Sequence, residues 1–274
     1  ASRLLERLAP WRTAPSWCVA LSGGLDSSVL LHLLATLRAR HDLPVLRAIH
    51  VHHGLQPAAD AWPEHCRQLC DGLGVELLVR QVQVAQAASV EQAARNARYD
   101  AFAGALRPGE VLLTGQHRDD QAETLLLRLM RGAGLRGLSA MPSQRSLGAG
   151  MLVRPLLDIS RDELLAYVRE HEVPWVEDPS NEDTRFARNY LRHQVLPALL
   201  SRWPQASRSL ARAASHLGEA RELLDELAQQ DLAAALEPCR HSWLALPSLS
   251  LSRLAELSPA RQRNCLLYTS LSGL

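Results

Sequence analysis

The chain has 274 residues, 47% of them hydrophobic, and its 30 basic and 29 acidic residues leave a formal net charge of +1. This length accommodates one large domain with an appendage, and so balanced a charge does not by itself indicate a nucleic-acid partner. The chain contains arginine but no lysine. Arginine binds phosphate in a bidentate manner better than lysine does, but we consider coding bias the better explanation of this composition. With no apolar segment of membrane-spanning length and no signal-peptide pattern, the sequence predicts a soluble cytoplasmic protein.

Apolar runs alternate with segments of helical periodicity as far as residue 131. We expect strands over residues 19–21, 45–51, 75–84 and 111–114, and helices over 1–8, 28–39, 58–73, 89–106 and 121–131, with Ser89 as an N-cap. This alternation predicts an α/β fold with a doubly wound parallel sheet. Polar clusters follow the first, second and fourth strands, and ligands of such sheets bind beyond the carboxyl ends of the strands.

The second half of the chain is predominantly helical. We expect helices over residues 161–170 and 187–200, and a long helical segment over 206–236 that is rich in Ala, Leu and Glu. The change of composition near residue 205 predicts two parts. These are an α/β domain over residues 1–205, which carries the polar clusters, and a small helical segment over 206–274.

The sequence Ser-Gly-Gly-Leu-Asp-Ser-Ser over residues 22–28 links the first strand to the first helix. Adjacent glycines let the backbone approach an anion closely, and the helix N-terminus favours negative charge. No lysine follows the glycines, so this is not a Walker loop. A carboxylate at Asp26 beside a phosphate needs a cation between them, and we expect Mg²⁺ there. The predicted phosphate-binding residues are Ser22, Gly23, Gly24, Asp26, Ser27 and Ser28.

A second polar cluster follows the fourth strand. His117, Asp120 and Glu123 crowd the start of the helix predicted there, and the two acids share a helix face because they lie three residues apart. Acids at a helix N-terminus also serve as caps, but capping does not explain all three residues. The paired carboxylates predict a site for a cation, either a metal ion or the ammonium groups of an amino acid.

Two arginine-rich segments give weaker signals. Arg95 and Arg98 lie three residues apart beside Tyr99 on a predicted helix, where a solvated helix face is an equally good interpretation. Farther on, the turn at residues 177–181 leads into a helix with Arg188 and Arg192, a combination suited to RNA phosphates.

The histidines and cysteines show no regular metal-ligand spacing. His50, His52 and His53 lack a further ligand pair, so we expect structural or substrate-contacting histidines rather than a zinc site. The cysteines form no C-x-x-C pair, which is typical of reduced thiols in the cytoplasm. They are Cys18, Cys66, Cys70, Cys239 and Cys265.

Several blocks of the sequence together resemble the tRNA(Ile)-lysidine synthases, a family within the wider PP-loop ATP pyrophosphatases. The block at residues 22–27 is typical of the whole PP-loop group, whereas the Asp-Asp-Gln-x-Glu-Thr block makes the resemblance specific. The blocks cover residues 22–27, 50–55, 93–99, 116–124, 131–138, 154–157, 178–181 and 188–192.

By this resemblance, the protein is an ATP-dependent ligase that modifies cytidine 34 in the CAU anticodon of an isoleucine tRNA. ATP adenylates O2 of that cytosine and releases pyrophosphate. The ε-amine of free L-lysine then attacks C2 and expels AMP, which forms lysidine. The implied cofactors are ATP and Mg²⁺, the implied partners are this tRNA and lysine, and we allow for a homodimer.

The resemblance also assigns roles to the residues named above. The loop at residues 22–28 holds ATP, with Asp26 on Mg²⁺, and Asp120 and Glu123 receive the substrate lysine. The implied catalytic residues are Asp26, Arg95, Arg98, His117 and Asp120. The implied tRNA-binding residues are Arg131, Arg136, Arg188 and Arg192.

The sequence also departs from the family pattern. Gln116 stands where many members have histidine, and Met130 where a basic residue is frequent. Many members continue into further C-terminal domains, so residues 206–274 resemble the start of a truncated tRNA-binding domain. The alternatives are another adenylating PP-loop enzyme, such as a tRNA thiolase with its paired cysteines, or a non-catalytic tRNA-binding remnant.

Overall fold

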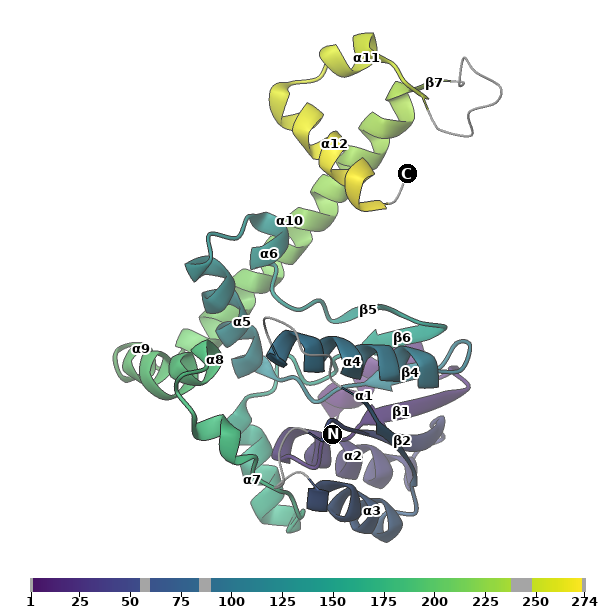
Figure 1. The fold of residues 1–274 in the computed structure, drawn as a ribbon, viewed down its shortest axis with the longest axis vertical. Coiled ribbons are helices and arrows are strands. Elements are labelled where there is room, and N and C mark those ends of the chain that lie inside the picture. The colour runs from purple at the N-terminus through teal and green to yellow at the C-terminus, as the bar shows by residue number, and fades with distance from the viewer. Residues whose placement is uncertain (1, 55–59, 84–89, 238–247, 273–274) are drawn as a thin grey trace.

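The computed structural model describes residues 2–54, 60–83, 90–237 and 248–272 (Figure 1). A six-stranded sheet in the order β3-β2-β1-β4-β6-β5 forms its centre. All neighbouring strands pair in parallel except β5 and β6. The predicted doubly wound α/β fold is therefore confirmed. The strands are β1 (Ser16–Ala20), β2 (Val45–His52), β3 (Glu76–Gln81), β4 (Val111–Leu113), β5 (Gln144–Leu147) and β6 (Gly150–Val153).

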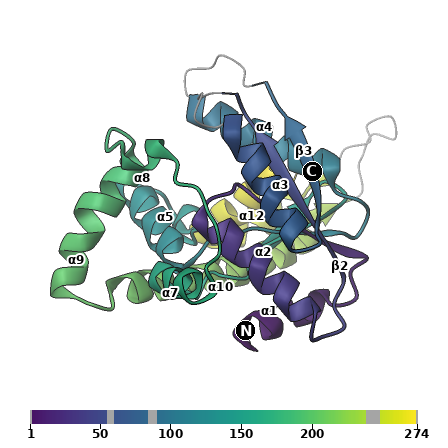
Figure 2. The same cartoon turned by 90° about the horizontal axis from the view of Figure 1, so that it is seen from below.

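Helices cover both faces of the sheet, because successive strand residues point to opposite faces. On one face, Val19 and Leu46 belong to a core shared with α1, α2, α3 and α7, and on the other face Cys18 and Ile49 pack with Phe102 of α4. Seen from below, α2 lies between α3 and α7 (Figure 2). The helices are α1 (Ser2–Leu8), α2 (Leu25–Arg38), α3 (Trp62–Gly72), α4 (Val90–Ala105) and α7 (Arg161–His171).

The sequence pattern does not predict the hairpin of β5 and β6. Each strand has four residues, and a tight turn at Gly148, with φ +54°, joins them. The hairpin extends the sheet beyond β4 and brings Arg145 and Arg154 to its edge. The predicted N-cap at Ser89 and the predicted helix start at residue 58 lie outside the described residues.

The second half of the chain is helical, as predicted. After α5 (Arg118–Met130) and α6 (Leu135–Leu138), one helical run comprises α8 (Ala187–Tyr190), a π-helical turn (Leu191–Val195) and α9 (Leu196–Arg202). Helix α10 (Ala206–Ala235) then leads away from the sheet to α11 (Leu251–Ala255) and α12 (Pro259–Ser272), next to the short pair β7 (Leu236–Glu237) and β8 (Ser248–Leu249) (Figure 1). No helix in the described ranges is long and apolar enough to cross a bilayer.

Candidate active site

The loop after β1 turns through two glycines and is held by its own serines. Gly23 has a φ of +88°, which favours glycine. The Ser27 hydroxyl accepts a hydrogen bond from the backbone N–H of Ser22 (3.1 Å) and donates one to the carbonyl of Gly24 (3.0 Å). Gly24 is the N-cap of α2, and no described side chain caps that end. The helix N-terminus and its loop thus form the arrangement that binds phosphate in other folds.

A second loop, which follows β4, passes directly against the start of α2. A Cβ atom on Gly115 would lie 2.9 Å from the carbonyl of Asp26 and 3.0 Å from the backbone nitrogen of Ser27. Only glycine therefore allows so close an approach. The approach places His117, the N-cap of α5, beside Asp26, with 3.6 Å between Nε2 and Oδ1. The two polar motifs of the sequence form one site at the carboxyl ends of β1 and β4.

His117 is 1% exposed and faces three carboxylates. Its Nε2 lies 3.6 Å from Oδ1 of Asp26 and 3.6 Å from Oδ2 of Asp120, and its Nδ1 lies 3.8 Å from Oδ2 of Asp119. Burial alone lowers the pKa of an imidazole, but the three negative charges outweigh burial and raise the pKa of His117 above its ordinary value. The side chain is thus suited to remain positively charged inside the site.

Two arginines engage the paired acids of α5. Arg188 donates from Nε to Glu123 (2.6 Å) and from Nη2 to Asp120 (2.9 Å), and Arg192 donates from Nε to Glu123 (2.7 Å). Glu123 is 1% exposed, so the guanidinium groups balance a buried charge. Burial alone raises the pKa of Asp120, but His117 and the two arginines hold it below its ordinary value. We call these four residues, Asp120, Glu123, Arg188 and Arg192, the acid–arginine cluster.

The contacts of this cluster differ from those expected from the sequence. Arg188 and Arg192 are predicted to contact tRNA, yet their guanidinium groups contact Asp120 and Glu123, the acids predicted to receive lysine. The spacing along the chain cannot reveal this contact, because 65 residues separate Arg188 from Glu123. A continuous helical run positions both arginines, which lie one helical turn apart.

The site offers one clear ligand for a cation. Oδ1 of Asp26 is buried and has no hydrogen-bond partner among the described residues. A carboxylate oxygen of this kind fits a hard cation such as Mg²⁺. Within the described ranges, no group of three or more His, Cys, Asp or Glu side chains could hold a metal ion. Asp26 would therefore share the ion with phosphate oxygens of a bound nucleotide.

Comparison with known families agrees with this geometry. The sequence profile of the PP-loop domain matches residues 1–199, a range that contains the phosphate loop and the acid–arginine cluster. The chain belongs to the PP-loop family.

The resemblance to the lysidine synthases is likewise confirmed. The tRNA(Ile)-lysidine synthase of Pseudomonas fluorescens (strain Pf0-1) is 62% identical over 97% of this chain, and that of Coxiella burnetii (strain RSA 493 / Nine Mile phase I) is 44% identical over 96%. The chain spans 60% and 57% of these two proteins, about three fifths of their length.

A solved structure shares the fold of this PP-loop protein. The U34-tRNA thiolase of Methanococcus maripaludis, with its 4Fe–4S cluster, has a TM-score of 0.64 and 17% identity, over 80% of this chain and 78% of that one. At this identity the likeness shows the fold alone.

The turn predicted at residues 177–181 lies beside the phosphate loop and is held by hydrogen bonds. The Asp178 carboxylate accepts a hydrogen bond from the backbone N–H of Ser180 (2.9 Å), and the Asn189 amide donates to the carbonyl of Ser180 (2.8 Å). The backbone N–H of Val176 donates to the carbonyl of Gly23 (2.9 Å). The turn thus links the phosphate loop to the helical run that carries Arg188.

The histidines at the end of β2 contact protein groups. His50 Nδ1 lies 2.9 Å from the carbonyl of Leu21, and His52 Nε2 lies 3.3 Å from Oδ1 of Asp60. His53 Nε2 accepts a hydrogen bond from Nε of Arg98 (3.1 Å). Burial, and then the charge of Arg98, lower the pKa of His53 to about 4, so His53 is neutral at physiological pH. Arg98 is thereby held near the carboxyl end of β2.

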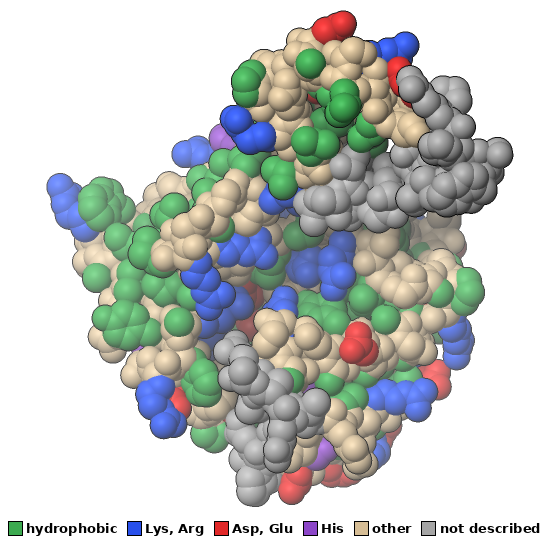
Figure 3. Space-filling model, turned by 45° about the horizontal axis from the view of Figure 1, so that its top comes forward, with side chains coloured by type: hydrophobic (Ala, Val, Ile, Leu, Met, Phe, Trp, Pro, Cys, Tyr) green, Lys and Arg blue, Asp and Glu red, His purple; other side chains and the backbone are tan. Residues whose placement is uncertain are grey.

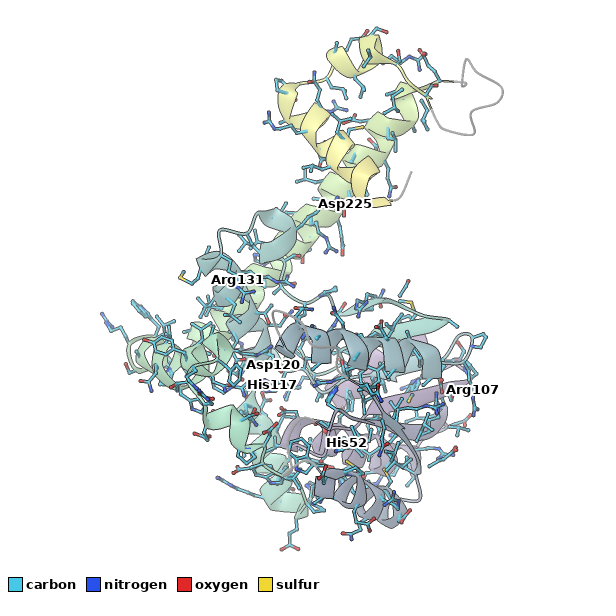
Figure 4. The ribbon with its side chains drawn as sticks, viewed as in Figure 1. His52, Arg107, His117, Asp120, Arg131 and Asp225 are labelled. Carbon is cyan, nitrogen blue, oxygen red and sulfur yellow. The ribbon has the colours of Figure 1, made fainter. Side chains whose placement is uncertain are left out.

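The remaining predicted residues lie apart from the cluster. Arg131 is exposed at the far end of α5 from His117 and Asp120 (Figure 4). Arg136 in α6 forms an ion pair with Asp225 of α10 (2.7 Å), which joins α6 to the C-terminal helices. Arg95 lies over the ring of Tyr99, with 5.2 Å between the guanidinium carbon and the ring centroid.

Proposed function

We propose that this chain carries the catalytic part of a tRNA(Ile)-lysidine synthase, which joins L-lysine to C2 of cytidine 34 in an isoleucine tRNA with the CAU anticodon. The observation that carries the proposal is the direct apposition of the phosphate loop and the acid–arginine cluster through Asp26 and His117. One part suits a nucleoside triphosphate and the other an amino acid. The names of the relatives, at 62% and 44% identity, support the same reaction.

In the first step, O2 of the cytosine attacks the α-phosphorus of ATP, and pyrophosphate leaves. The loop at residues 22–28 and the N-terminus of α2 bind the phosphates, and Asp26 would hold Mg²⁺. When bound, the metal offsets charge on the leaving pyrophosphate. Arg98 of α4, which is hydrogen-bonded to His53 near the carboxyl end of β2, would meet the negative charge that develops on the transferred phosphate, and the same role for Arg95 stays a prediction.

In the second step, the unprotonated ε-amine of lysine attacks C2. The C2–O2 bond breaks, AMP leaves with the oxygen, and the new nitrogen substituent gives up a proton. The acid–arginine cluster contains both charges that a free amino acid requires, and in this structure they are paired with each other. Asp120 and Glu123 suit its α-ammonium group, while Arg188 and Arg192 suit its α-carboxylate.

A cytoplasmic location is consistent with reduced thiols and with free lysine and tRNA as substrates. The homodimer stays a prediction.

The described cysteines disfavour sulfur transfer. Cys18, Cys66, Cys70 and Cys265 are all free and buried, and burial raises the pKa of the first three to about 12. Sulfur transfer requires an accessible thiolate, which these residues do not provide. Cys239 lies outside the described residues.

Lysine incorporation tests the proposal. The 274-residue chain is incubated with ATP, Mg²⁺, radiolabelled lysine and an isoleucine tRNA transcript. Labelled lysine should enter the transcript with the CAU anticodon and should not enter one with uridine at position 34. Incorporation without ATP, or equal incorporation into both transcripts, would contradict the proposal. Asp26→Asn should abolish pyrophosphate release, whereas Asp71→Asn, on the exposed side of α3, should release it normally.

A further inference from the structure

A pocket with four arginines in its lining lies beside the proposed active site. Its volume is about 450 Å³, which is within the range of pockets that hold small ligands. Its lining contains one carboxylate, that of Asp100, and four guanidinium groups. These belong to Arg95, Arg128, Arg145 and Arg154, and we call the site the arginine pocket.

The arginine pocket lies at the same edge of the sheet as the phosphate loop. Arg154 directly follows β6, and Arg145 lies opposite Leu152 near the end of that strand. Only β4 separates β6 from β1 in the sheet, so the ends of β1 and β6 are about 10 Å apart. Figure 3 shows Arg side chains gathered around the hollow at the centre of the face it presents.

The positive charges of this pocket have no acidic partners. Among the described residues, none of its four arginines forms an ion pair. Arg128 instead donates to the carbonyl groups of Gly137 (2.6 Å) and Ala140 (2.7 Å), and Arg154 donates to that of Pro142 (2.7 Å). Neutral carbonyls fix these guanidinium groups in place without neutralising them. Such an arrangement is complementary to a bound anion.

Arg154 gives the clearest indication of an anion site. Its side chain belongs to a residue that is 3% exposed, and its Nε has no hydrogen-bond partner in the described structure. A buried charged group is normally paired or hydrogen-bonded, because removal from water is unfavourable. Burial lowers the pKa of Arg154 below its ordinary value, and the charges of Arg145 and Arg95 add to this effect, whereas the hydroxyl of Tyr99, to which Arg154 is hydrogen-bonded, opposes it. An anion in the pocket would offset this buried positive charge.

An aromatic ring organises the same groups. The guanidinium carbons of Arg95 and Arg145 lie 5.2 Å and 4.8 Å from the centroid of Tyr99, which are cation–π distances. Burial alone would raise the pKa of Tyr99, but the surrounding arginines hold it below its ordinary value. The ring therefore positions arginines from two elements, α4 and β5, around one space.

We propose that the arginine pocket binds a phosphodiester group of the RNA strand whose base is presented to the phosphate loop. This inference rests on the proposed function. The ligand chemistry is a phosphate held by guanidinium forks, and the other source of such a group is ATP. RNA is favoured because the phosphate loop already provides for the nucleotide, and because the pocket lies two strands away from that loop along the same edge of the sheet.

Binding of a fluorescent anticodon stem-loop RNA to the 274-residue chain tests this proposal. Arg145→Ala and Arg154→Gln should each weaken RNA binding about tenfold and reduce the salt slope by about one. Arg145 is exposed, so its variant should fold normally. Arg169→Ala, on an exposed part of α7, should bind like the unaltered chain. The affinity for ATP alone, measured in parallel, should not change in either pocket variant.

Replacement of single phosphodiesters in the RNA by neutral methylphosphonate linkages identifies the phosphate that the arginine pocket binds. With the unaltered chain, substitution at one linkage near the target cytidine should weaken binding, and with Arg145→Ala the same substitution should have no further effect. Loss of ATP affinity with unchanged RNA affinity would overturn the assignment to RNA, and no change in either affinity would overturn the pocket itself. If Arg145→Ala and Arg154→Gln weaken RNA binding but the unaltered chain does not incorporate lysine, the proposed function is wrong and the RNA-binding role of the pocket is supported. If the chain incorporates lysine and the two variants bind RNA normally, only the role of the pocket is wrong.

Discussion

The imidazole of His117 lies 3.6 Å from each of two carboxylates that come from different motifs. One of them, Asp26, belongs to the phosphate loop, and the other, Asp120, belongs to the acid–arginine cluster. A neutral side chain at this position would leave two acids to repel each other across the site. The charge of His117 therefore joins the phosphate loop to the acid–arginine cluster.

The pKa of His117 provides a direct test at the residue scale. NMR titration should give a pKa above the ordinary value near 6.5, because the carboxylates favour the charged ring. The charged ring stabilises the fold fully below this ordinary value, and the stabilisation is lost as pH rises through the raised pKa. Asp120→Asn should lower the pKa of His117, whereas Asp162→Asn, an exposed change in α7, should not. A pKa at or below the ordinary value would contradict this account.

The buried charge of Glu123 depends on its arginines. Arg192→Ala should destabilise the protein by about 3 kcal/mol, because it leaves a buried carboxylate short of a partner. The matched control is Arg185→Ala, since Arg185 pairs with Asp183 on the surface, where its side chain is 89% exposed, and should leave stability unchanged. Thermal unfolding measures both variants. Equal melting temperatures for the two would show that the acid–arginine cluster does not stabilise the fold.

Local elements could be predicted from the sequence, but contacts between distant elements could not. The phosphate loop is a strand, a turn and a helix start in consecutive residues, so Ser22 to Ser28 show its nature directly. The pairing of Arg188 with Glu123 depends on how two helices pack. Arg145 lies in a short strand with no clear alternation, and nothing in its own segment indicates that it faces Tyr99.

The junction between the two active-site loops gives a test at the element scale. Gly115→Ala should destabilise the protein by about 2 kcal/mol, because the new Cβ overlaps the backbone of α2, and should weaken ATP binding. Gly104→Ala is the matched control, since a Cβ there meets nothing within 4 Å and the residue lies in a helix. Chemical denaturation and ATP titration measure both effects. Normal stability and ATP affinity in Gly115→Ala would disprove the close approach.

At the scale of the whole molecule, α10 connects the α/β part to the C-terminal helices. Helix α10 starts at Ala206, next to the boundary predicted near residue 205, and the division into two domains stays a prediction. In the first half of α10, Ala214 packs with Leu125 of α5 and with Ala140. At the far end, Arg261 of α12 donates to the Asp231 carboxylate of α10 (3.1 Å). The helical segment is thus anchored on α5, the helix that carries Asp120 and Glu123.

This anchoring predicts a contrast between two neighbouring alanines. Ala214 is 1% exposed, so Ala214→Glu should destabilise the protein by about 3 kcal/mol, because it buries a charge between α10 and α5. Ala213 is exposed, and Ala213→Glu should have little effect. Hydrogen exchange should show faster opening of α5 and α10 in the first variant only. Equal exchange in both variants would show that α10 does not dock on α5 in solution.

The products formed from ATP test the central claim most directly, namely that the phosphate loop and the acid–arginine cluster act together as an adenylating ligase. ATP labelled at the α-phosphate, and in a parallel reaction at the γ-phosphate, is supplied with lysine and the CAU-anticodon tRNA, and the products are separated by chromatography. The account predicts AMP and pyrophosphate in amounts equal to the lysine incorporated, and neither product when Asp26 is replaced by Asn. Formation of ADP and phosphate, or AMP release that is independent of the tRNA, would contradict it.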